Sequence, residues 1–296
     1  MGNILTKKFY RQRKDFEDSC AGRDAGLTFP EGVICSTDIA YADDGIKAHM
    51  LDIYRPEDSQ EKILPVIINV HGGGLIIGNK EFNRYFCALL CKKGFLVYSI
   101  EYRLIPDCLI YDQIADVFMA MDYIKERLAA DGGDSSHVYM AGDSGGACLI
   151  TYANAIQNST NIARAANVTP SGLRINALGL ISGMFYTSRF DKIGLFLPKY
   201  LYGRDYKKTP FAKYVNPENR ELLNSLAPVW LVTSHNDFLR RYTTDFEKAL
   251  TRAEREHELV VFPKNKKLTH AFSVFEPFMP ESGAVIDMMV EYLRKF

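Results

Sequence analysis

The sequence predicts an α/β protein built on one mostly parallel sheet, with an antiparallel hairpin at its start and helices on both faces. Six short, continuous apolar runs recur along the chain, as expected for strands that are buried on both faces of a sheet. Apolar residues at helical spacing fill the intervals between these runs. Such alternation of strand and helix is typical of a parallel sheet. With 296 residues, of which 47% are hydrophobic, the chain is long enough to bury one large core.

The elements can be placed along the chain from these patterns. Residues 46–54 alternate loosely and follow the turn sequence Asp43-Asp44-Gly45, which predicts an exposed antiparallel strand that leaves a hairpin. In the first 30 residues the apolar positions are too irregular to predict a helix. The predicted buried strands are 66–70, 95–100, 138–141, 177–181, 229–232 and 259–262, and the predicted helices are 82–92, 114–128, 147–156 and 246–255.

The interval from residue 183 to residue 224 contains no strand pattern. It is aromatic and basic and holds three prolines. An interval of this length between core elements is typical of a functional loop or of a small insertion with its own helices. We therefore predict that it contributes to a cap.

The composition excludes several classes of function. Lys plus Arg and Asp plus Glu both number 36, so no net charge attracts nucleic acid or an anionic membrane. No apolar run reaches about 18 residues, so we expect no membrane span. The N-terminus lacks the apolar core of a secretion signal, and the six cysteines show no metal or redox spacing. These features predict a cytoplasmic protein with free thiols and no metal.

Residues 142–146, Gly-Asp-Ser-Gly-Gly, form the most informative motif. They follow the predicted strand 138–141 and precede a predicted helix, which is the context of the Gly-x-Ser-x-Gly nucleophile elbow. Gly142 and Gly146 leave room for a tight turn that exposes the hydroxyl of Ser144. The alternatives are a turn that cradles phosphate and the nucleophile motif of chymotrypsin-like proteases. The second requires two β-barrels, which the alternating strands and helices exclude.

A glycine cluster follows the predicted strand 66–70. His71-Gly72-Gly73-Gly74 resembles the motif whose amides stabilise the oxyanion in esterases. We predict that Gly73, Gly74 and Gly145 donate these hydrogen bonds, because a developing oxyanion needs donors that are already in position. We interpret His71 as a group that shapes the loop, and a flexible glycine turn is the alternative.

The serine needs a base, and His270 is the best of the six histidines. It lies in a loop after the last predicted strand, at the carboxyl edge of the sheet. Asp237 follows the preceding strand, in the Ser–Asp–His order of this type of fold, and is predicted to orient His270. A helix N-cap is the alternative role for Asp237, and Asp143 is interpreted as structural. The histidines left as bystanders are His49, His137, His235 and His257.

Residues 33–296 resemble the hormone-sensitive-lipase-like family of bacterial esterases within the α/β hydrolases. The motifs that carry this resemblance are His71-Gly72-Gly73-Gly74, Glu101-Tyr102-Arg103-Leu104-Ile105-Pro106-Asp107, Gly142–Gly146, Asp237-Phe238-Leu239 and Thr269-His270-Ala271-Phe272. The resemblance implies a catalytic triad of Ser144, Asp237 and His270, short-chain acyl esters as substrates and no cofactor. It also implies a helical cap of residues 1–32 and 183–224 over a catalytic core of residues 33–182 and 225–296.

The chain departs from this family at two places. The family commonly has alanine where this chain has Gly145, and Pro-Leu followed by an acid where this chain has 238–241, Phe-Leu-Arg-Arg. These departures concern substrate preference more than the chemistry. We expect a carboxylesterase-type serine hydrolase that acts on a small-molecule ester. The alternatives are an amidase, peptidase or formamidase with the same triad, or a ligand-binding homologue without turnover. A homodimer is left open.

Overall fold

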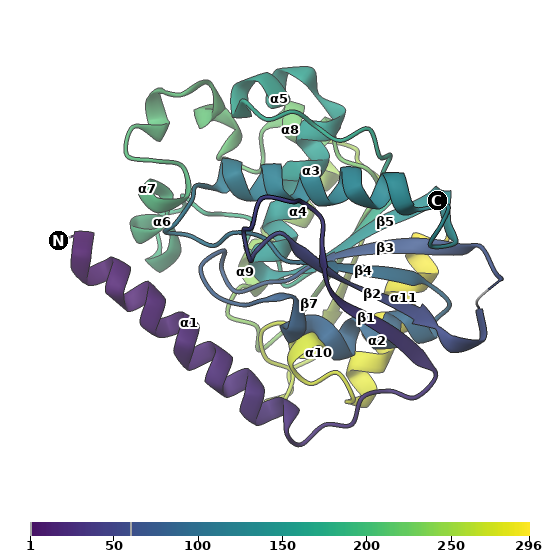
Figure 1. Ribbon diagram of the computed structural model, residues 1–296. Helices are drawn as coiled ribbons and strands as arrows, with labels where there is room; N and C mark the ends of the chain where they lie inside the picture. Colours follow the sequence, from purple (N-terminus) through teal and green to yellow (C-terminus); the bar gives the residue numbers. More distant parts are fainter. Residues whose placement is uncertain (1, 60) are drawn as a thin grey trace.

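The structure, a computed structural model, describes residues 2–59 and 61–296 (Figure 1). Within these residues one eight-stranded sheet has the order β1-β2-β4-β3-β5-β6-β7-β8. β2 pairs antiparallel with β1 and β4, and the remaining strands run parallel. The predicted sheet is therefore confirmed. Its strands are β1 (Val33–Ala40), β2 (Met50–Pro56), β3 (Leu64–Val70), β4 (Leu96–Ile100), β5 (Gly133–Asp143), β6 (Ala177–Ile181), β7 (Val229–Ser234) and β8 (His257–Phe262).

The opening hairpin differs from the prediction in its second strand. β2 begins at Met50, four residues later than predicted, because residues 46–49 close a turn in which the amide of His49 donates to the carbonyl of Ile46. β2 is also largely buried rather than exposed. It lies inside the sheet between β1 and β4, so both of its edges are hydrogen-bonded.

Helices cover both faces of the sheet (Figure 1). Alternate residues of β3 point to opposite faces, so Ile68 packs in one apolar cluster and Ile67 in the other. The first cluster is covered by α3 (Ile110–Arg127), α4 (Ser144–Asn158), α5 (Thr160–Ala166) and α9 (Arg240–Arg252). The second is covered by α2 (Arg84–Lys92), α10 (Phe272–Phe275) and α11 (Pro280–Leu293).

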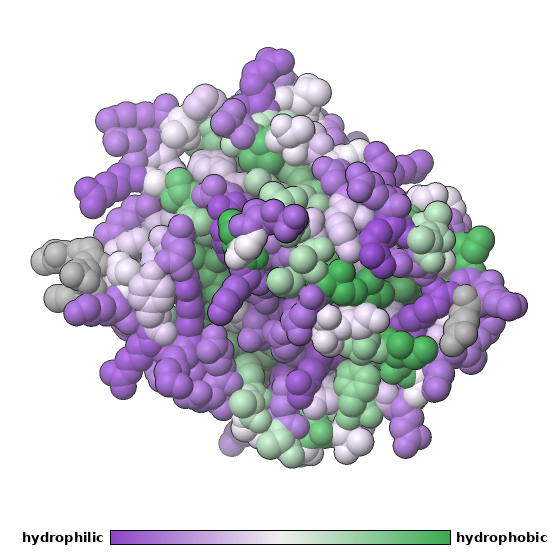
Figure 2. Space-filling view, in the orientation of Figure 1, coloured by the Kyte–Doolittle hydropathy of each residue, from purple (hydrophilic) through white to green (hydrophobic). Residues whose placement is uncertain are grey.

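The N-terminal segment is a 23-residue helix, α1 (Gly2–Asp24), which the sequence patterns did not predict. It touches the rest of the molecule at widely spaced points. The ring of Phe9 lies 5.2 Å from that of Tyr200, and the ring of Phe16 lies 4.9 Å from that of Phe82. The outward side of α1, at the lower left of the view, is mainly hydrophilic (Figure 2). Only a narrow stripe of α1, which includes Phe9 and Phe16, is apolar and packed. The apolar residues of α1 are therefore too few to show a helical period in the sequence.

Residues 183–224 form short helices and pack on the side of the sheet that α3 and α4 cover. The ring of Phe211 lies 5.5 Å from that of Tyr152 on α4, and the ring of Tyr202 lies 6.4 Å from that of Tyr111 on α3. The division into a core and a cap stays a prediction. The short elements are η1 (Glu57–Ser59), η2 (Lys80–Asn83), α6 (Lys192–Phe196), α7 (Pro198–Leu201), η3 (Tyr206–Lys208), η4 (Pro210–Tyr214) and α8 (Arg220–Asn224).

None of the helices in residues 2–59 and 61–296 is long and apolar enough to cross a membrane.

Candidate active site

Ser144 lies on a sharp turn between β5 and α4. β5 ends at Asp143 and α4 begins at Ser144, whose φ of 49° is in the left-handed region that a side chain rarely adopts. The turn is packed against the end of β3, where a Cβ on Gly146 would collide with the carbonyl oxygen of Val70. The free amides and the dipole at the start of α4 favour negative charge beside the serine.

The predicted base and acid meet this serine. Nε2 of His270 lies 2.9 Å from Oγ of Ser144, and Nδ1 lies 2.7 Å from Oδ1 of Asp237. An ionised carboxylate only accepts, so Nδ1 carries the proton and Nε2 is free to accept from the hydroxyl. The structure thus brings three side chains from the ends of β5, β7 and β8 into one hydrogen-bonded chain, and their catalytic roles stay a prediction.

Asp237 is buried but well supplied with donors. The hydroxyl of Thr233 donates to Oδ2 at 2.9 Å, and the amide of Leu239 donates to Oδ1 at 2.8 Å. Burial alone would raise the pKa of Asp237, but hydrogen bonding and the charge of His270 outweigh it, helped by Ser182 and Leu239, and lower that pKa. Asp237 is therefore held ionised. It is not a helix N-cap, because α9 begins at Arg240 with Leu239 before it.

Ser182 is a site residue that sequence analysis missed. Its hydroxyl accepts from the amide of Ala271 at 3.1 Å, directly after the base, and it also bonds Asp237. Ala271 has a φ of 49°, so the loop that carries His270 is bent at this point and is held by the end of β6. Its position directly after predicted strand 177–181 was the available signal, because the carboxyl ends of parallel strands share one edge.

The second half of the site is the loop of residues 71–78, here called the glycine loop. Gly73 has a φ of 101°, and a Cβ there would collide with the carbonyl oxygen of Ile77. Within the described residues, the amides of Gly73 and Gly74 donate to no protein acceptor. Gly145 faces them closely: a Cβ on it would lie 2.9 Å from the nitrogen of Gly74 and 2.8 Å from that of Leu75. The amide of Gly74 thus lies close to Gly145, the residue after Ser144, and the donor roles of Gly73, Gly74 and Gly145 stay a prediction.

Asp143 joins the glycine loop to the nucleophile turn. It is buried, and its Oδ1 accepts from the amide of Gly72 and from Nδ2 of Asn83, both at 3.0 Å. Burial raises the pKa of Asp143, although Asn83 and the nearby His71 and His270 oppose this shift. Through these two hydrogen bonds the carboxyl connects the glycine loop to Asn83, and its structural role stays a prediction. Asn83 was missed because it belongs to no motif.

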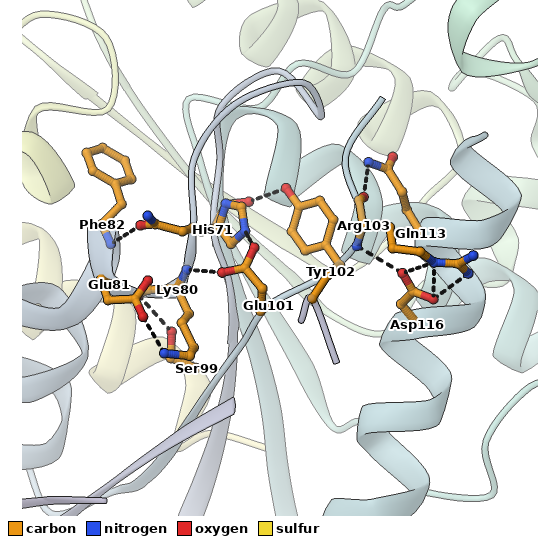
Figure 3. Close-up of polar contacts among 12 residues, drawn as sticks. His71, Lys80, Glu81, Phe82, Ser99, Glu101, Tyr102, Arg103, Gln113 and Asp116 are labelled. Carbon is orange, nitrogen blue, oxygen red and sulfur yellow. Dashed lines mark hydrogen bonds and ion pairs between the residues drawn. The ribbon is translucent and has the colours of Figure 1, made fainter. Parts of the chain in front are cut away.

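His71 lies fully buried beneath the loop, in a polar network that is drawn in Figure 3. Its Nδ1 lies 2.8 Å from the carbonyl oxygen of Gly72 and its Nε2 lies 3.2 Å from Oε1 of Glu101. Both nitrogens face acceptors, which favours the doubly protonated ring. Burial lowers the pKa of His71, but the charge and hydrogen bond of Glu101 outweigh it and raise that pKa. Tyr102 stacks on the ring, with centroids 4.4 Å apart.

A pocket of about 910 Å³ opens beside the base. Its apolar wall includes Phe238, whose ring lies 4.4 Å from that of His270 and whose exposed fraction is 74%. In contrast, Met184, Phe185 and Tyr186 are buried, and the rings of Phe185 and Phe246 stack 4.2 Å apart, so these three residues are packing residues. The pocket is lined by Asn236, Phe238, Lys267, Thr269, His270, Phe275, Glu276 and Met279.

The bystander residues lie away from this centre. His49 binds Asp44 and Asp116, His137 binds Asp134, and His257 is the first residue of β8. The amide of His235 pairs with Phe262. The described part of the chain contains no group of three or more His, Cys, Asp or Glu side chains that could hold a metal ion.

The chain is similar to known families and proteins. The family model of the α/β-hydrolase fold matches residues 67–273, which confirms the resemblance drawn from the motifs. "Probable isoprenylcysteine alpha-carbonyl methylesterase ICME" of Oryza sativa is 29% identical over 184 residues, covering 58% of this chain and 44% of its own length. "Esterase LipQ" of Mycobacterium tuberculosis is 32% identical over 120 residues, covering 40% and 28% respectively. The chain thus spans less than half the length of these curated relatives.

Solved structures share the fold over the whole chain. Esterase B of Lactobacillus rhamnosis superposes with a TM-score of 0.92 at 22% identity, covering 100% of this chain and 96% of its own. At this identity the likeness concerns the fold.

Proposed function

Since the chain belongs to the α/β-hydrolase fold family, we propose that it is a serine carboxylic-ester hydrolase that forms an acyl-serine intermediate. The observation that carries this proposal is the continuous path from Asp237 through His270 to Ser144, with steps of 2.7 and 2.9 Å. A hydroxyl is a weak nucleophile, and only such a path gives it a base whose tautomer is fixed. The amides of Gly73 and Gly74 support the proposal further, because within the described residues they donate to no protein acceptor and are free to donate to an oxyanion.

In the first half-reaction Oγ of Ser144 attacks the ester carbonyl while Nε2 of His270 takes the hydroxyl proton. The carbonyl oxygen becomes an oxyanion and accepts from the amides of Gly73, Gly74 and Gly145. His270 becomes an imidazolium, which Asp237 stabilises through Nδ1. The tetrahedral species then expels the alkoxide, which leaves as an alcohol with the proton from Nε2.

In the second half-reaction water replaces the alcohol. His270 takes a proton from the water as its oxygen attacks the acyl carbonyl, and the same amides hold the oxyanion. Collapse of this species breaks the bond to Ser144 Oγ, which recovers the proton from Nε2. The products are the carboxylic acid and the free enzyme. Every proton is carried by His270, so no cofactor is required by this scheme.

We propose short-chain acyl or acetyl esters as substrates. The pocket beside His270 has an apolar wall that includes Phe238 and Phe275, which suits the apolar part of an acyl ester. A structure of the Lactobacillus rhamnosis esterase is described with a tributyrin phosphonate inhibitor, which makes butyrate a rational first acyl group. Methyl esters belong in the same panel, since the rice relative is named a methylesterase.

The test is hydrolysis of p-nitrophenyl butyrate by the wild type and by Ser144→Ala. We expect Ser144→Ala to lose roughly 10⁴-fold or more in kcat, because the variant lacks the nucleophile. Ser136→Ala, at the exposed start of the same strand, is the matched control and should keep full activity. Circular dichroism and thermal melting report whether each variant folds. If Ser144→Ala hydrolysed p-nitrophenyl butyrate at the wild-type rate, the proposal would be wrong.

The alternative functions would use the same three side chains, so separate assays are needed to distinguish them. Matched p-nitrophenyl esters and anilides of one acyl group separate an esterase from an amidase, peptidase or formamidase. A fluorophosphonate probe separates an enzyme from a ligand-binding homologue, because labelling requires an activated serine. We expect labelling of the wild type, none of Ser144→Ala, and faster cleavage of the ester than of the amide.

A further inference from the structure

We propose that Arg13 of helix α1 is a positioning residue that holds the glycine loop in the conformation needed to bind the oxyanion. The inference rests on the proposed function for its catalytic consequence, but not for its structural one. Arg13 lies about one helical turn from each of Phe9 and Phe16, the two aromatic residues through which α1 (lower left in Figure 1) packs on the rest of the molecule. Its spacing of four and three residues from these two rings puts it on the same face of α1.

The guanidinium of Arg13 uses all three of its nitrogens. Nε donates to the carbonyl oxygen of Ile76 in the glycine loop at 2.8 Å. Nη2 donates to the carbonyl oxygens of Leu104 and Ile105 at 3.0 and 2.7 Å. Nη1 donates to Oδ2 of Asp107 at 2.8 Å. One side chain from a distant helix therefore ties the glycine loop to segment 104–107.

The contact with Ile76 reaches the proposed oxyanion donors through planar peptides. The peptide that carries the Ile76 carbonyl also carries the amide of Ile77, which donates to the carbonyl oxygen of Gly73 at 3.0 Å. The peptide that carries the Gly73 carbonyl also carries the amide of Gly74, one of the proposed donors. Fixing the Ile76 carbonyl thus fixes the direction in which the Gly74 amide points. Two hydrogen bonds and two peptide planes thus connect Arg13 to the amide of Gly74, which would donate to the oxyanion.

The hydrogen bonds from Arg13 to segment 104–107 also support the glycine loop, through the carbonyl of Leu75. The amide of Ile105, in the segment that Arg13 holds, donates to the carbonyl oxygen of Leu75 at 3.0 Å. Nε2 of Gln113 donates to the same oxygen at 3.0 Å. The peptide of that carbonyl carries the amide of Ile76, which also donates to Gly73 at 3.1 Å. Arg13 therefore acts on both peptides that grip Gly73.

The glycine loop needs such outside support. Leu75 has a φ of 69°, a left-handed conformation that costs a residue with a side chain of order 1–3 kcal/mol and persists only when its surroundings enforce it. The side chain of Arg13 is 18% exposed, so its hydrogen bonds are partly shielded from water. Only the planar fork of an arginine reaches three carbonyls and a carboxylate at once. Lysine carries the charge on a single nitrogen without this geometry.

The experiment compares Arg13→Ala with Arg11→Ala in the full-length chain. Arg11 lies on the same helix, is 83% exposed and pairs only weakly, at 3.8 Å, with Asp15, so it is a matched control. Two quantities are measured: kcat and KM for p-nitrophenyl butyrate, and hydrogen exchange of the peptide that contains residues 71–78. We expect Arg13→Ala to lower kcat roughly 10- to 100-fold, because small misplacements of positioned groups have effects of this size. KM should change little, since the oxyanion forms only in the transition state. Exchange in the loop should rise, and Arg11→Ala should change neither quantity.

Arg13→Lys separates geometry from charge, and we expect it to resemble Arg13→Ala in both quantities. It also replaces Arg13→Ala if the latter fails to fold. Exchange of residues 71–78 that equals that of Arg11→Ala would overturn the proposal, as would a raised KM at unchanged kcat. If the wild type hydrolyses no ester, the proposed function falls, and loop exchange alone still decides whether Arg13 clamps the loop.

Discussion

The two halves of the candidate site are held in different ways. On the base side, each side chain that would act in catalysis also positions the next one: Asp237 holds His270, and His270 holds Ser144. On the amide side, the groups that would act are backbone amides of the glycine loop. Their positions depend on residues that would never touch the substrate, such as Asn83 and Gln113.

This difference predicts two kinds of mutational effect. A substitution on the base side removes a chemical step, so its effect is large and confined to activity. A substitution on the amide side displaces backbone, so its effect is smaller and is spread over catalysis, loop exchange and stability. Variants on the two sides of the site should therefore differ in the size and in the spread of their effects.

Asp237→Asn should give the largest effect after removal of the nucleophile. An amide at this position presents a donor to Nδ1 and stabilises the wrong tautomer, which typically costs about 10⁴-fold in kcat while the geometry stays intact. Initial rates with p-nitrophenyl butyrate measure the loss. Asp205→Asn, in which an exposed aspartate paired with Lys208 is changed, is the matched control and should be unaffected. Activity within tenfold of the wild type would show that another carboxylate orients His270.

Gly145→Ala should give an intermediate effect on the amide side. The added Cβ would lie 2.8 Å from the nitrogen of Leu75 and 2.9 Å from that of Gly74, closer than carbon atoms normally approach backbone. The glycine loop must move away, which we expect to lower kcat about 10- to 100-fold, less than or near the effect of losing one oxyanion donor.

The control for this variant is Gly283→Ala, in which a Cβ on a helical glycine meets no atom within 4 Å. It should leave kcat unchanged and gain about 0.5–1 kcal/mol of stability from helix propensity. A Gly145→Ala variant with wild-type kcat would mean that the glycine loop accommodates the added methyl group without moving the amides. The predicted sensitivity of the amide side of the site to backbone displacement would then be wrong.

The base side could be predicted from sequence because its working parts are side chains with recognisable spacing. Ser144 sits in an elbow motif, and Asp237 and His270 follow successive strands, so fold order alone brought them to one edge. The buried strands were predicted for the same reason, since continuous apolar runs report burial on both faces. Ser182 shares that edge but is a residue type too common to single out.

The amide side could be predicted only in part. The three consecutive glycines predicted the loop. In contrast, Arg13, Asn83 and Gln113 belong to no recognisable motif. Their contacts with the loop and its neighbours could not be predicted from sequence. α1 was missed for a related reason: Arg13 occupies the middle of the stripe between Phe9 and Phe16, so a polar residue interrupts the apolar period. Arg13 thus both interrupts the apolar pattern of α1 and forms the hydrogen bonds that link α1 to the glycine loop.

The smallest expected effect concerns the buried pair of His71 and Glu101, and it tests whether the amide side is also held by charge. The carboxylate of Glu101 outweighs burial and raises the pKa of His71, with Asp143 adding to the shift. A raised pKa means that the pair's stabilisation is fully present below about pH 6.5, the usual value for histidine, and is lost as pH rises through the raised value.

Glu101→Gln should therefore lower the free energy of unfolding by about 1 kcal/mol at pH 6 and by less at pH 9. At high pH a neutral His71 still donates through Nδ1 to the carbonyl oxygen of Gly72. In the variant its Nε2 can then accept a hydrogen bond from the glutamine amide, whereas in the wild type the ionic bond to Glu101 is lost. The difference in stability between the two proteins is therefore smaller at pH 9. Urea unfolding of both proteins at the two pH values measures this difference of differences. Glu61→Gln, at an exposed position outside the network, controls for the loss of one negative charge. A destabilisation by Glu101→Gln that is equal at both pH values would mean that His71 is neutral throughout, and that hydrogen-bond geometry alone holds the floor of the glycine loop.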